Sequence, residues 1–595
     1  MLKTLGGQVK EFKKDSILTP VFMILEVIME TINGIIVSMI TSKIMETIIP
    51  LIMGSIIDDG VQKGNLTHIY LMGALMVLTA FVSLWAGAMG GKYGASASTG
   101  FARNLRKAMY DNIQTFSFSN IDKFSTSGLV TRLTTDVTNV QNAYQMILRM
   151  CMRAPASLIC AMAMSFYVNA RVASIYLIAV IILGCFLALI IKVAMKYFDQ
   201  VFKKYDKLNE SVQENVNAIR VVKAYSRESF EQKKFTKASE NVYKMFIKAE
   251  KTVAYNMPLM NLTVYSCILI ISLVGAKLIV GGDMEIGNLS TLLAYCMNIL
   301  MSLMMLSMVF VMITMSVSSA ERICEVINEK PDITNPEKPV MEVKSGDISF
   351  EHVNFSYKKE AKTPVLKDIN LEIKSGQTIG IIGGTGSAKS SLVNLLSRLY
   401  DVTDGAVKIG GIDVRRYDIE TLRDEVAVVL QKNVLFSGTI LDNLRWGDKN
   451  ATDEECIRAC KLACADEFID RMPDGYNTYI EQGGNNVSGG QKQRLCIARA
   501  LIKKPKVLIL DDSTSAVDTA TDAKIRKAFA EEIPGTTKII IAQRVSSIKD
   551  CDKIIVMEDG CVNGFGTSDE LLENNEIYKE VYESQVNGNA DFDEK

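Results

Sequence analysis

Histidine is scarce in this sequence, with 2 His among 595 residues. A site that depends on imidazole, for a metal ion or for acid–base catalysis, is therefore disfavoured. The 12 cysteines show no Cys-x-x-Cys spacing and many lie in apolar runs, so we interpret them as reduced, buried thiols. A formal net charge of −1 gives no indication of nucleic-acid binding. No small-residue cleavage site follows the basic, amphipathic residues 1–14, which we interpret as an interfacial helix and not a signal peptide.

Long apolar runs alternate with charged segments over residues 15–320, and the chain is 48% hydrophobic. We expect six membrane spans, because each run reaches the roughly 20 residues that a bilayer requires. They are residues 18–57, 66–93, 139–167, 172–194, 254–281 and 287–316. The segments 95–138 and 195–253 are rich in Lys and Arg, whereas the opposite turns are short and mostly acidic. Positive loops stay inside, so we expect a multi-pass protein of the cell membrane with both termini cytoplasmic.

The first apolar stretch, residues 18–57, is about twice as long as one crossing. The sequence Ile-Met-Glu-Thr-Ile occurs in it twice, at Ile28–Ile32 and Ile44–Ile48, which indicates a local duplication. We interpret the stretch as one long helix that extends out of the membrane. Three carboxylates interrupt it: Glu26, Glu30 and Glu46. Such groups either form a functional site or lie near the interface or a water-filled cavity.

The composition changes near residue 320. We expect a transmembrane domain at 1–320, a linker with three prolines at 321–340, an α/β domain at 341–582 and a disordered polar tail at 583–595. In the α/β domain a glycine-rich turn stands between an apolar strand pattern, Thr378–Ile382, and a helical pattern, Leu392–Leu399. The turn reads Gly383, Gly384, Thr385, Gly386, Ser387, Ala388, Lys389, Ser390 and Ser391.

Strand, glycine-rich turn, Lys-Ser and helix form the layout of a P-loop, whose backbone N–H groups bind phosphate oxygens. Lys389 would reach the β- and γ-phosphates of a nucleotide, and the Ser390 hydroxyl would ligate Mg²⁺. Ala388 stands where the pattern has its last glycine. If this position has a positive φ, the methyl group costs roughly 1 kcal/mol.

A second apolar strand, Val507–Leu510, ends in Asp511 and Asp512. An aspartate in this place beside a P-loop supplies a carboxylate for Mg²⁺. About twenty residues upstream lie Asn486, Val487, Ser488, Gly489, Gly490 and Gln491. This run resembles the Leu-Ser-Gly-Gly-Gln signature of the ABC transporter ATPase domain, with Val487 in place of leucine. Nearly the whole chain resembles an exporter-type half-transporter, which implies six spans followed by an ATPase domain, a dimer of such halves, and ATP with Mg²⁺.

The resemblance also implies roles for residues outside the P-loop. Tyr357 matches the aromatic residue that stacks on adenine. Gln431 matches the glutamine that ligates Mg²⁺ and links the attacking water to the membrane domain. Ser515, Ala516, Val517 and Asp518 resemble the D-loop. Residues 120–128 and 224–235 occupy the places of the two coupling helices, and we expect the second, through Tyr225 and Phe230, to dock on the partner's ATPase domain.

Two positions depart from the family pattern in a way that bears on catalysis. The catalytic glutamate is here Asp512, and the switch histidine is here Gln543. Aspartate is one methylene shorter, and glutamine cannot carry a positive charge. Loss of a positioned base typically costs about 10²–10⁴-fold in rate. The chain should therefore bind ATP well and hydrolyse it poorly at its own P-loop, as in the degenerate-site subunit of heterodimeric multidrug ABC exporters.

We interpret the chain as one half of a heterodimeric exporter that moves a hydrophobic or amphipathic small molecule, a drug or a lipid, across the cytoplasmic membrane. A homodimeric exporter with slow ATP turnover is the alternative in the same class. An ATP-gated channel or sensor is the alternative in another class. The expected partners are a second half-transporter, the bilayer and the substrate, and no nucleic acid, because the six spans exclude a soluble ABC ATPase of DNA or ribosome work.

Overall fold

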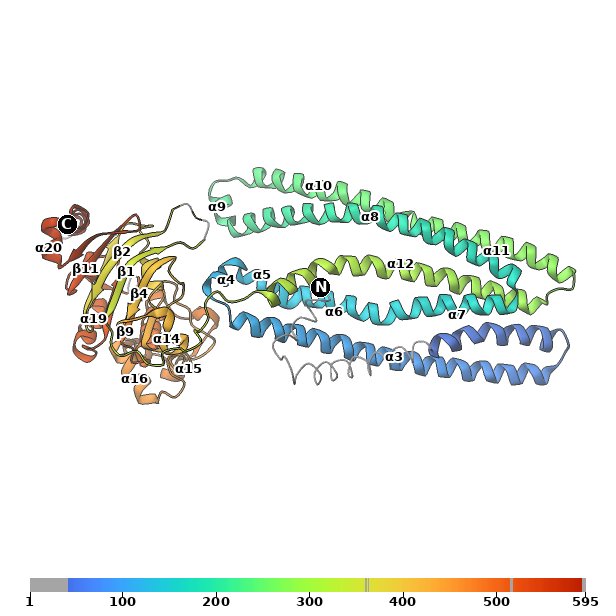
Figure 1. The fold of residues 1–595 in the computed structure, drawn as a ribbon, viewed down its shortest axis with the longest axis horizontal. Coiled ribbons are helices and arrows are strands. Elements are labelled where there is room, and N and C mark those ends of the chain that lie inside the picture. Colours follow the sequence, from blue (N-terminus) through green and yellow to red (C-terminus); the bar gives the residue numbers. More distant parts are fainter. Residues whose placement is uncertain (1–40, 359–360, 362, 514–516, 591–595) are drawn as a thin grey trace. The chain divides into compact units, whose positions relative to one another are not determined.

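The computed structural model describes residues 41–358, 361, 363–513 and 517–590 (Figure 1). The chain folds into two compact units. The helical unit contains the residues up to Gln114 together with Ser125–Glu329, and the sheet unit contains Thr115–Phe124 together with Lys330–Lys595. The expected interfacial helix at 1–14, most of the first expected span, and Glu26 and Glu30 lie outside the described residues.

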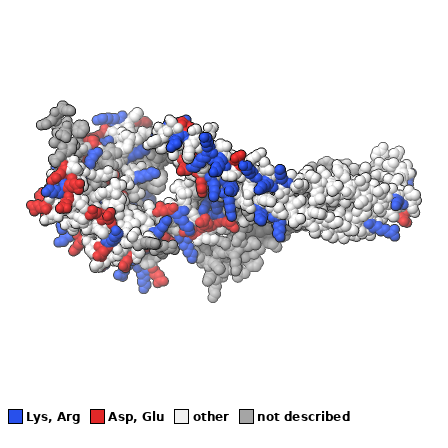
Figure 2. Space-filling model, turned by 90° about the horizontal axis from the view of Figure 1, so that it is seen from above, with Lys and Arg blue, Asp and Glu red and all other residues white. Residues whose placement is uncertain are grey.

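The helical unit consists of long helices that run side by side (Figure 1). Five helices among the described residues are long and apolar enough to cross a membrane: Leu66–Gln114, Thr126–Val168, Ala170–Asn217, Glu228–Val280 and Ile286–Val309. Figure 2 shows that much of their surface lacks charge, whereas Lys and Arg gather toward one end of these helices. The five positions match the second to sixth expected spans.

The elements of the helical unit follow one another with short connections. They are a helix at 41–55, η2 (Ile56–Val61), α3 (Leu66–Gln114), α5 (Thr126–Thr131), η3 (Arg132–Asp136), α6 (Val137–Met146), η4 (Ile147–Cys151), α7 (Met152–Val168), α8 (Ala170–Asn217), α9 (Ile219–Ala224), α10 (Glu228–Ala254), α11 (Asn256–Val280) and α12 (Ile286–Asn328). We expected a separate coupling helix over 224–235. The short helix is instead α9, and the segment 224–235 holds the turn after α9 and the start of α10.

Buried hydroxyl groups join the helices of this unit. The Tyr176 hydroxyl of α8 donates to the Leu292 carbonyl at 2.8 Å, and the Tyr295 hydroxyl donates to the Thr47 carbonyl at 2.6 Å. Both tyrosines are buried in a core that α7, α8, α11 and α12 share. Because an unpaired buried hydroxyl is costly, these bonds fix the register of α12 against its neighbours.

The sheet unit is built on a six-stranded sheet with the strand order β12-β11-β3-β10-β9-β6. Its strands are β3 (Thr378–Gly383), β6 (Val426–Val429), β9 (Val507–Asp511), β10 (Thr537–Ile541), β11 (Lys553–Glu558) and β12 (Cys561–Gly566). β10 pairs in parallel with β3 and β9, and β9 pairs in parallel with β6. The carboxyl ends of these four strands therefore meet at one edge, where ligands bind in open α/β sheets.

A second sheet has the order β2-β1-β4-β5, and β7 pairs with β8. These strands are β1 (Ile348–Phe355), β2 (Leu366–Ile373), β4 (Asp404–Ile409), β5 (Ile412–Asp413), β7 (Gly438–Thr439) and β8 (Tyr479–Ile480). The helices are α4 (Phe118–Lys123), α13 (Lys389–Asn394), α14 (Ile419–Glu425), α15 (Ile440–Leu444), α16 (Asp453–Leu462), α17 (Asp466–Ile469), α18 (Gly489–Ile502), α19 (Thr519–Glu532), α20 (Ser568–Asn574) and α21 (Glu576–Ala590). The expected start of the tail, residue 583, falls inside α21. The expected fold class, a helical membrane region followed by an α/β domain, is confirmed.

Candidate functional site

The glycine-rich turn begins where β3 ends and runs into α13, as the sequence predicts. Ala388, the residue before α13, has φ 70° and ψ 24°. The φ is positive, so this alanine carries a strain that glycine would avoid. The Lys389 ammonium donates to the carbonyl groups of Gly383 and Gly384, at 2.8 Å each. Burial lowers the pKa of Lys389, against the opposing effect of Asp511 and Asp512.

Ser390 and Asp511 lie in contact at the edge of the sheet. The Ser390 hydroxyl donates to Asp511 Oδ1 at 3.1 Å, and Asp511 is buried at the end of β9. Burial raises the pKa of Asp511, while the Ser390 hydrogen bond and the Lys389 charge oppose that rise. A hydroxyl and a carboxylate are the oxygen ligands that Mg²⁺ prefers, and this ion usually takes its remaining ligands from water and phosphate. The pair fits a magnesium ion whose other ligands come from a nucleotide.

Asp512 and Gln543, the two departures from the family pattern, form a hydrogen bond with each other. Gln543 Nε2 donates to Asp512 Oδ2 at 2.7 Å. Register explains the meeting, because Asp511 pairs with Ile541 in neighbouring parallel strands and both residues follow those strands. The Gln543 backbone is also held, since Gln585 Nε2 of α21 donates to its carbonyl at 2.9 Å. The Asp512 carboxylate is therefore already engaged by an amide donor.

Tyr357 lies near the P-loop helix and is half-exposed. Its hydroxyl shares a hydrogen bond of 2.8 Å with Ser391, and its ring meets that of Tyr400 at right angles, with 5.0 Å between centroids. The Tyr400 hydroxyl in turn donates to Asp122 of α4 at 2.8 Å, and Phe118 lies against the Tyr400 ring. Sequence reasoning missed Tyr400, since no local pattern distinguishes it from the core residues that end the Leu392–Leu399 segment.

The signature turn forms the start of α18. Ser488 caps this helix, because its hydroxyl accepts from Gln491 N at 3.3 Å while Gln491 Oε1 accepts from Ser488 N at 2.8 Å. Val487, the departure from leucine, is buried in the core. A capped helix start presents backbone N–H groups to an anion. In the described part of the chain, no hydrogen bond connects the signature turn with Lys389. The signature turn and the P-loop are therefore not joined directly within the sheet unit.

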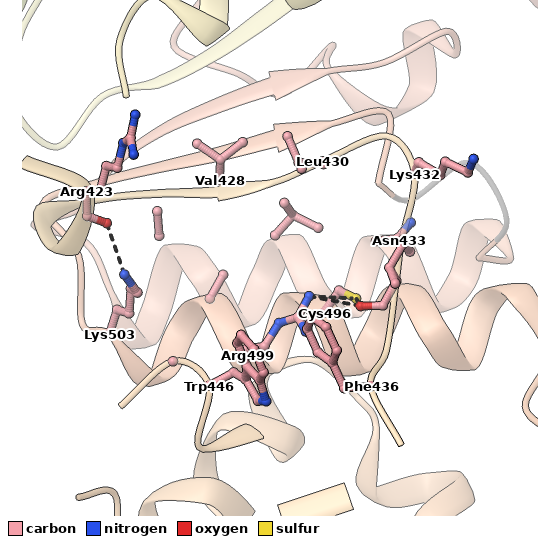
Figure 3. Close-up of a pocket in the computed structure, with 15 residues that line it drawn as sticks. Arg423, Val428, Leu430, Lys432, Asn433, Phe436, Trp446, Cys496, Arg499 and Lys503 are labelled. Atoms are coloured by element: carbon pink, nitrogen blue, oxygen red, sulfur yellow. Dashed lines mark hydrogen bonds between the residues drawn. The ribbon is translucent and has the colours of Figure 1, made fainter. Parts of the chain in front are cut away.

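Gln431 follows β6, whose carboxyl end lies at the same edge of the sheet as β9. Its side chain is exposed and does not line the nearby groove of about 360 Å³, although its neighbours Leu430 and Lys432 do (Figure 3). Phe436 and Trp446 stack on its lower side, with centroids 4.0 Å apart and planes 7° apart. Arg499 donates to the Val434 carbonyl at 3.3 Å. The groove is thus aromatic and basic, and Trp446 is 60% exposed.

Among the expected site residues, the structure brings together the P-loop, Asp511, Asp512 and Gln543, with Tyr357 on the Ser391 side. The signature turn lies apart from them. In the expected D-loop, residues 514–516 are outside the described residues, whereas Val517 is buried and Asp518 caps α19. The nucleotide-binding roles of these residues, and of the signature turn, stay predictions.

Comparisons with known proteins agree on both halves. The family profile "ABC transporter transmembrane region" matches residues 31–318, and the profile "ABC transporter" matches residues 366–515. The uncharacterized ABC transporter ATP-binding protein YfiB of Bacillus subtilis is 38% identical over 547 residues, which cover 92% of this chain and 95% of that protein. Rv1273c of Mycobacterium tuberculosis, another uncharacterized ABC transporter ATP-binding protein, is 35% identical over 552 residues, 92% of this chain and 94% of that protein.

A solved structure shows the same fold. The structure of a bacterial Atm1-family ABC exporter with ATP bound superposes with a TM-score of 0.82, covering 94% of this chain and 99% of that chain, at 23% identity.

Proposed function

The chain belongs to the ABC transporter family, with an exporter fold and an ATPase domain coupled to transport, and we propose that it is one half of a heterodimeric exporter in which its own ATP site is degenerate. The Asp512–Gln543 hydrogen bond carries this proposal. A carboxylate that accepts from an amide at 2.7 Å is a weaker base, and an amide at position 543 supplies no positive charge. Hydrolysis at this P-loop is consequently slow.

The parts that bind nucleotide are retained in the same site. Lys389 exchanges its bonds with the Gly383 and Gly384 carbonyls for phosphate oxygens. Ser390 and Asp511 would hold Mg²⁺, with Gln431 following β6 at the same edge, and Tyr357 would stack on the adenine. A bound Mg²⁺ would supply positive charge against the phosphates. This site therefore holds ATP for long periods and keeps two subunits together, while the turnover that drives transport takes place elsewhere.

The signature turn supplies the other half of the argument. In a head-to-tail dimer, Ser488, Gly489, Gly490 and Gln491 would contact the ATP on the partner's P-loop. That site would take its catalytic glutamate and histidine from the partner. The chain thus contributes an intact signature to a competent site and a weakened base to its own site. The ATPase domain and both termini would lie in the cytoplasm, and a hydrophobic or amphipathic molecule would be exported.

If ATP hydrolysis is to drive substrate transport, a helical unit must contact a sheet unit. We assign this role to the turn after α9, where Tyr225 is 75% exposed and Phe230 is also exposed. The Arg227 guanidinium lies 5.8 Å from the Phe230 ring centroid and orients that ring. On the sheet unit, the stacked Phe436 and Trp446 rings form an aromatic surface in the groove, which would accept the corresponding segment of the partner (Figure 3). Exposed aromatic residues dominate contacts of this type.

A crossed pattern of ATPase rates tests the degenerate-site assignment. In the purified complex with its partner half, Ser488→Ala should remove at least 90% of turnover, because it removes a γ-phosphate contact from the competent site. Asp512→Ala should change the rate by less than about threefold, because its site is already slow. Asp512→Glu combined with Gln543→His should raise the rate at this chain's site by at least tenfold.

Helix capping needs a separate control. Ser488→Ala also costs about 1 kcal/mol as a lost N-cap. Thr452 caps α16 by the same capping box, so Thr452→Ala removes a cap without touching the signature turn. Its ATPase rate should remain near that of the unmodified complex. Equal, severe losses for Ser488→Ala and Asp512→Ala would contradict the degenerate site and favour a homodimer with two catalytic sites.

A further inference from the structure

A small cavity opens inside the helical unit between the helix at 41–55, α3 and the junction of η4 with α7. Its volume is about 40 Å³, and its lining is Ser42, Gly87, Arg149, Met150 and Arg153. This volume equals roughly three water-sized spheres. It is too small for a whole drug-sized molecule, and it is large enough for a charged head group.

Positive charge exceeds negative charge around this cavity. Arg153 Nη2 donates to Glu46 Oε1 at 3.1 Å, and Lys43 pairs with the other oxygen of the same carboxylate. Two cations, Lys43 and Arg153, thus pair with one carboxylate, and the Arg149 charge is not paired by an acid in the described part of the chain. Lys43 is 13% exposed and Arg153 40%, so water screens these charges only in part.

The cavity lies at membrane depth, near the inner end of the spans. Arg153 is 15 residues before the end of α7 at Val168, which corresponds to about 22 Å along the helix. Gly87 is 21 residues after the start of α3 at Leu66, or about 32 Å. The hydrocarbon core is about 30 Å thick. The two positions therefore bracket its inner boundary, where an arginine side chain reaches both the interface and the apolar helices.

The walls of the cavity are fixed by packing. Ser42 and Ser83 are buried and share a hydrogen bond of 3.0 Å between their hydroxyl oxygens. The stem of Arg149 passes beside Gly94, where an added methyl group would lie at contact distance, 3.4 Å from Arg149 Cγ. Arg149 itself lies in η4, a π-helical segment of a kind that occurs often at functional sites. The backbone around the cavity is thus fixed by packing, and Arg153 is held by its ion pair with Glu46.

We propose that this cavity binds the anionic head group of an amphipathic substrate, a carboxylate, sulfate or phosphate, whose apolar tail stays along the helices. This inference rests on the proposed export function and names its substrate class. The two arginines offer planar donors that suit such oxyanions. Glu46 competes with the ligand for Arg153. It neutralises part of the charge when no ligand is bound, so its pairing with Arg153 lowers the affinity.

Binding of a defined probe to the full-length chain tests this. The probe is 12-(1-pyrenyl)dodecanoate at pH 8.5, where its carboxyl is ionised, and its methyl ester is the uncharged control with the same tail. The chain, in neutral maltoside micelles, carries Trp446→Phe, which leaves Trp85 of α3 as its only indole. Energy transfer from Trp85 reports binding locally, because Trp85 is two residues from Gly87.

Arg149→Gln and Arg153→Gln should each weaken dodecanoate binding at least fivefold, and Glu46→Gln should tighten it severalfold. Because the affinity should fall in the arginine variants and rise in Glu46→Gln, a general loss of packing cannot explain both results. If an arginine variant fails to fold, the affinity of Glu46→Gln still tests the proposal. Arg171→Gln, which removes an exposed arginine at the other end of α7 and α8, should change nothing. The ester should bind equally to all variants.

The proposal is overturned if dodecanoate binds no tighter than the ester, or if the two arginine variants and Glu46→Gln bind it like the parent chain. Phosphatidylcholine nanodiscs with and without phosphatidylglycerol separate the two sources of the anion. Displacement of the probe by phosphatidylglycerol would assign the site to a lipid head group, and persistence would assign it to a free amphiphile; either supports an anion site. The assay contains no ATP, so its failure is distinct from failure of the ATPase pattern.

Discussion

Ala388→Gly should stabilise the sheet unit, although it removes a side chain. Ala388 has φ 70° and ψ 24° immediately before Lys389. At such a position alanine is less favourable than glycine by about 1 kcal/mol. The methyl group is half-buried against the core, so its removal returns about 0.4 kcal/mol, half the value for a fully buried methylene. The net gain is about 0.6 kcal/mol, or about 1–2 °C in the unfolding midpoint of a domain of this size.

Tryptophan fluorescence can measure the unfolding of the sheet unit, because the chain has few tryptophans. The chain has 2 Trp, Trp85 in the helical unit and Trp446 in the sheet unit. In a Trp85→Phe background, fluorescence during heating of the full-length chain in detergent reports the sheet unit alone. Gly411→Ala is the matched control, because Gly411 has φ +79° and an added methyl group would meet no atom within 4 Å. This control should lower the midpoint by about 2–4 °C, the cost of the backbone alone.

The reasoning is refuted if Ala388→Gly lowers the midpoint while Gly411→Ala lowers it as expected. That result would mean that the methyl contact of Ala388 outweighs the strain of its backbone. The measured difference between the two variants would then give the packing free energy of that methyl group directly.

Two further predictions concern nucleotide binding and coupling. Lys389→Ala should weaken the affinity for a fluorescent ATP analogue, and Tyr357→Ala should weaken it by about 1–3 kcal/mol through loss of the stacking face. Replacing Tyr225 and Phe230 together with alanine should leave ATP binding intact and uncouple ATP hydrolysis from transport in inverted vesicles, and Trp446→Ala in the groove should have the same effect.

Matched controls separate these effects from loss of fold. Tyr479→Ala and Tyr243→Ala remove exposed tyrosines from other parts of the sheet unit and the helical unit, and both should bind ATP and transport normally. Unchanged affinity in Lys389→Ala would contradict the P-loop assignment. Normal transport by the Tyr225 and Phe230 double variant would contradict the docking of that turn on the partner.

Short sequence patterns predicted the strands whose carboxyl ends carry the P-loop and Asp511. β3 and β9 were expected within one residue of their observed bounds, because β-branched runs followed by Gly or Asp are local signals. The segment 224–235 is not one helix, because the chain turns between α9 and α10, where Ser226 has φ 50°. Tyr400 was missed because its contacts with Tyr357 and Asp122 join residues that are far apart in sequence.

In the sequence, Asp512 and Gln543 are 31 residues apart and depart from the family pattern separately. The strand order of the sheet shows that the two side chains form one hydrogen-bonded pair. Parallel pairing of β9 with β10 places both residues just beyond adjacent strands, where a short carboxylate and a long amide reach each other at 2.7 Å. A glutamate at 512 would extend its carboxylate by one methylene into the space of the Gln543 amide. A histidine at 543 would present a ring N–H to Asp512 in place of the amide, so the geometry of the bond would change.

Asp512→Glu alone and Gln543→His alone each disturb the hydrogen bond between positions 512 and 543, and neither alone restores both catalytic groups. Groups in direct contact of this kind typically couple by 0.5–3 kcal/mol. Recovery of hydrolysis should appear only when both positions change together, and the size of that coupling measures how far the degenerate site depends on the pair and not on either residue alone.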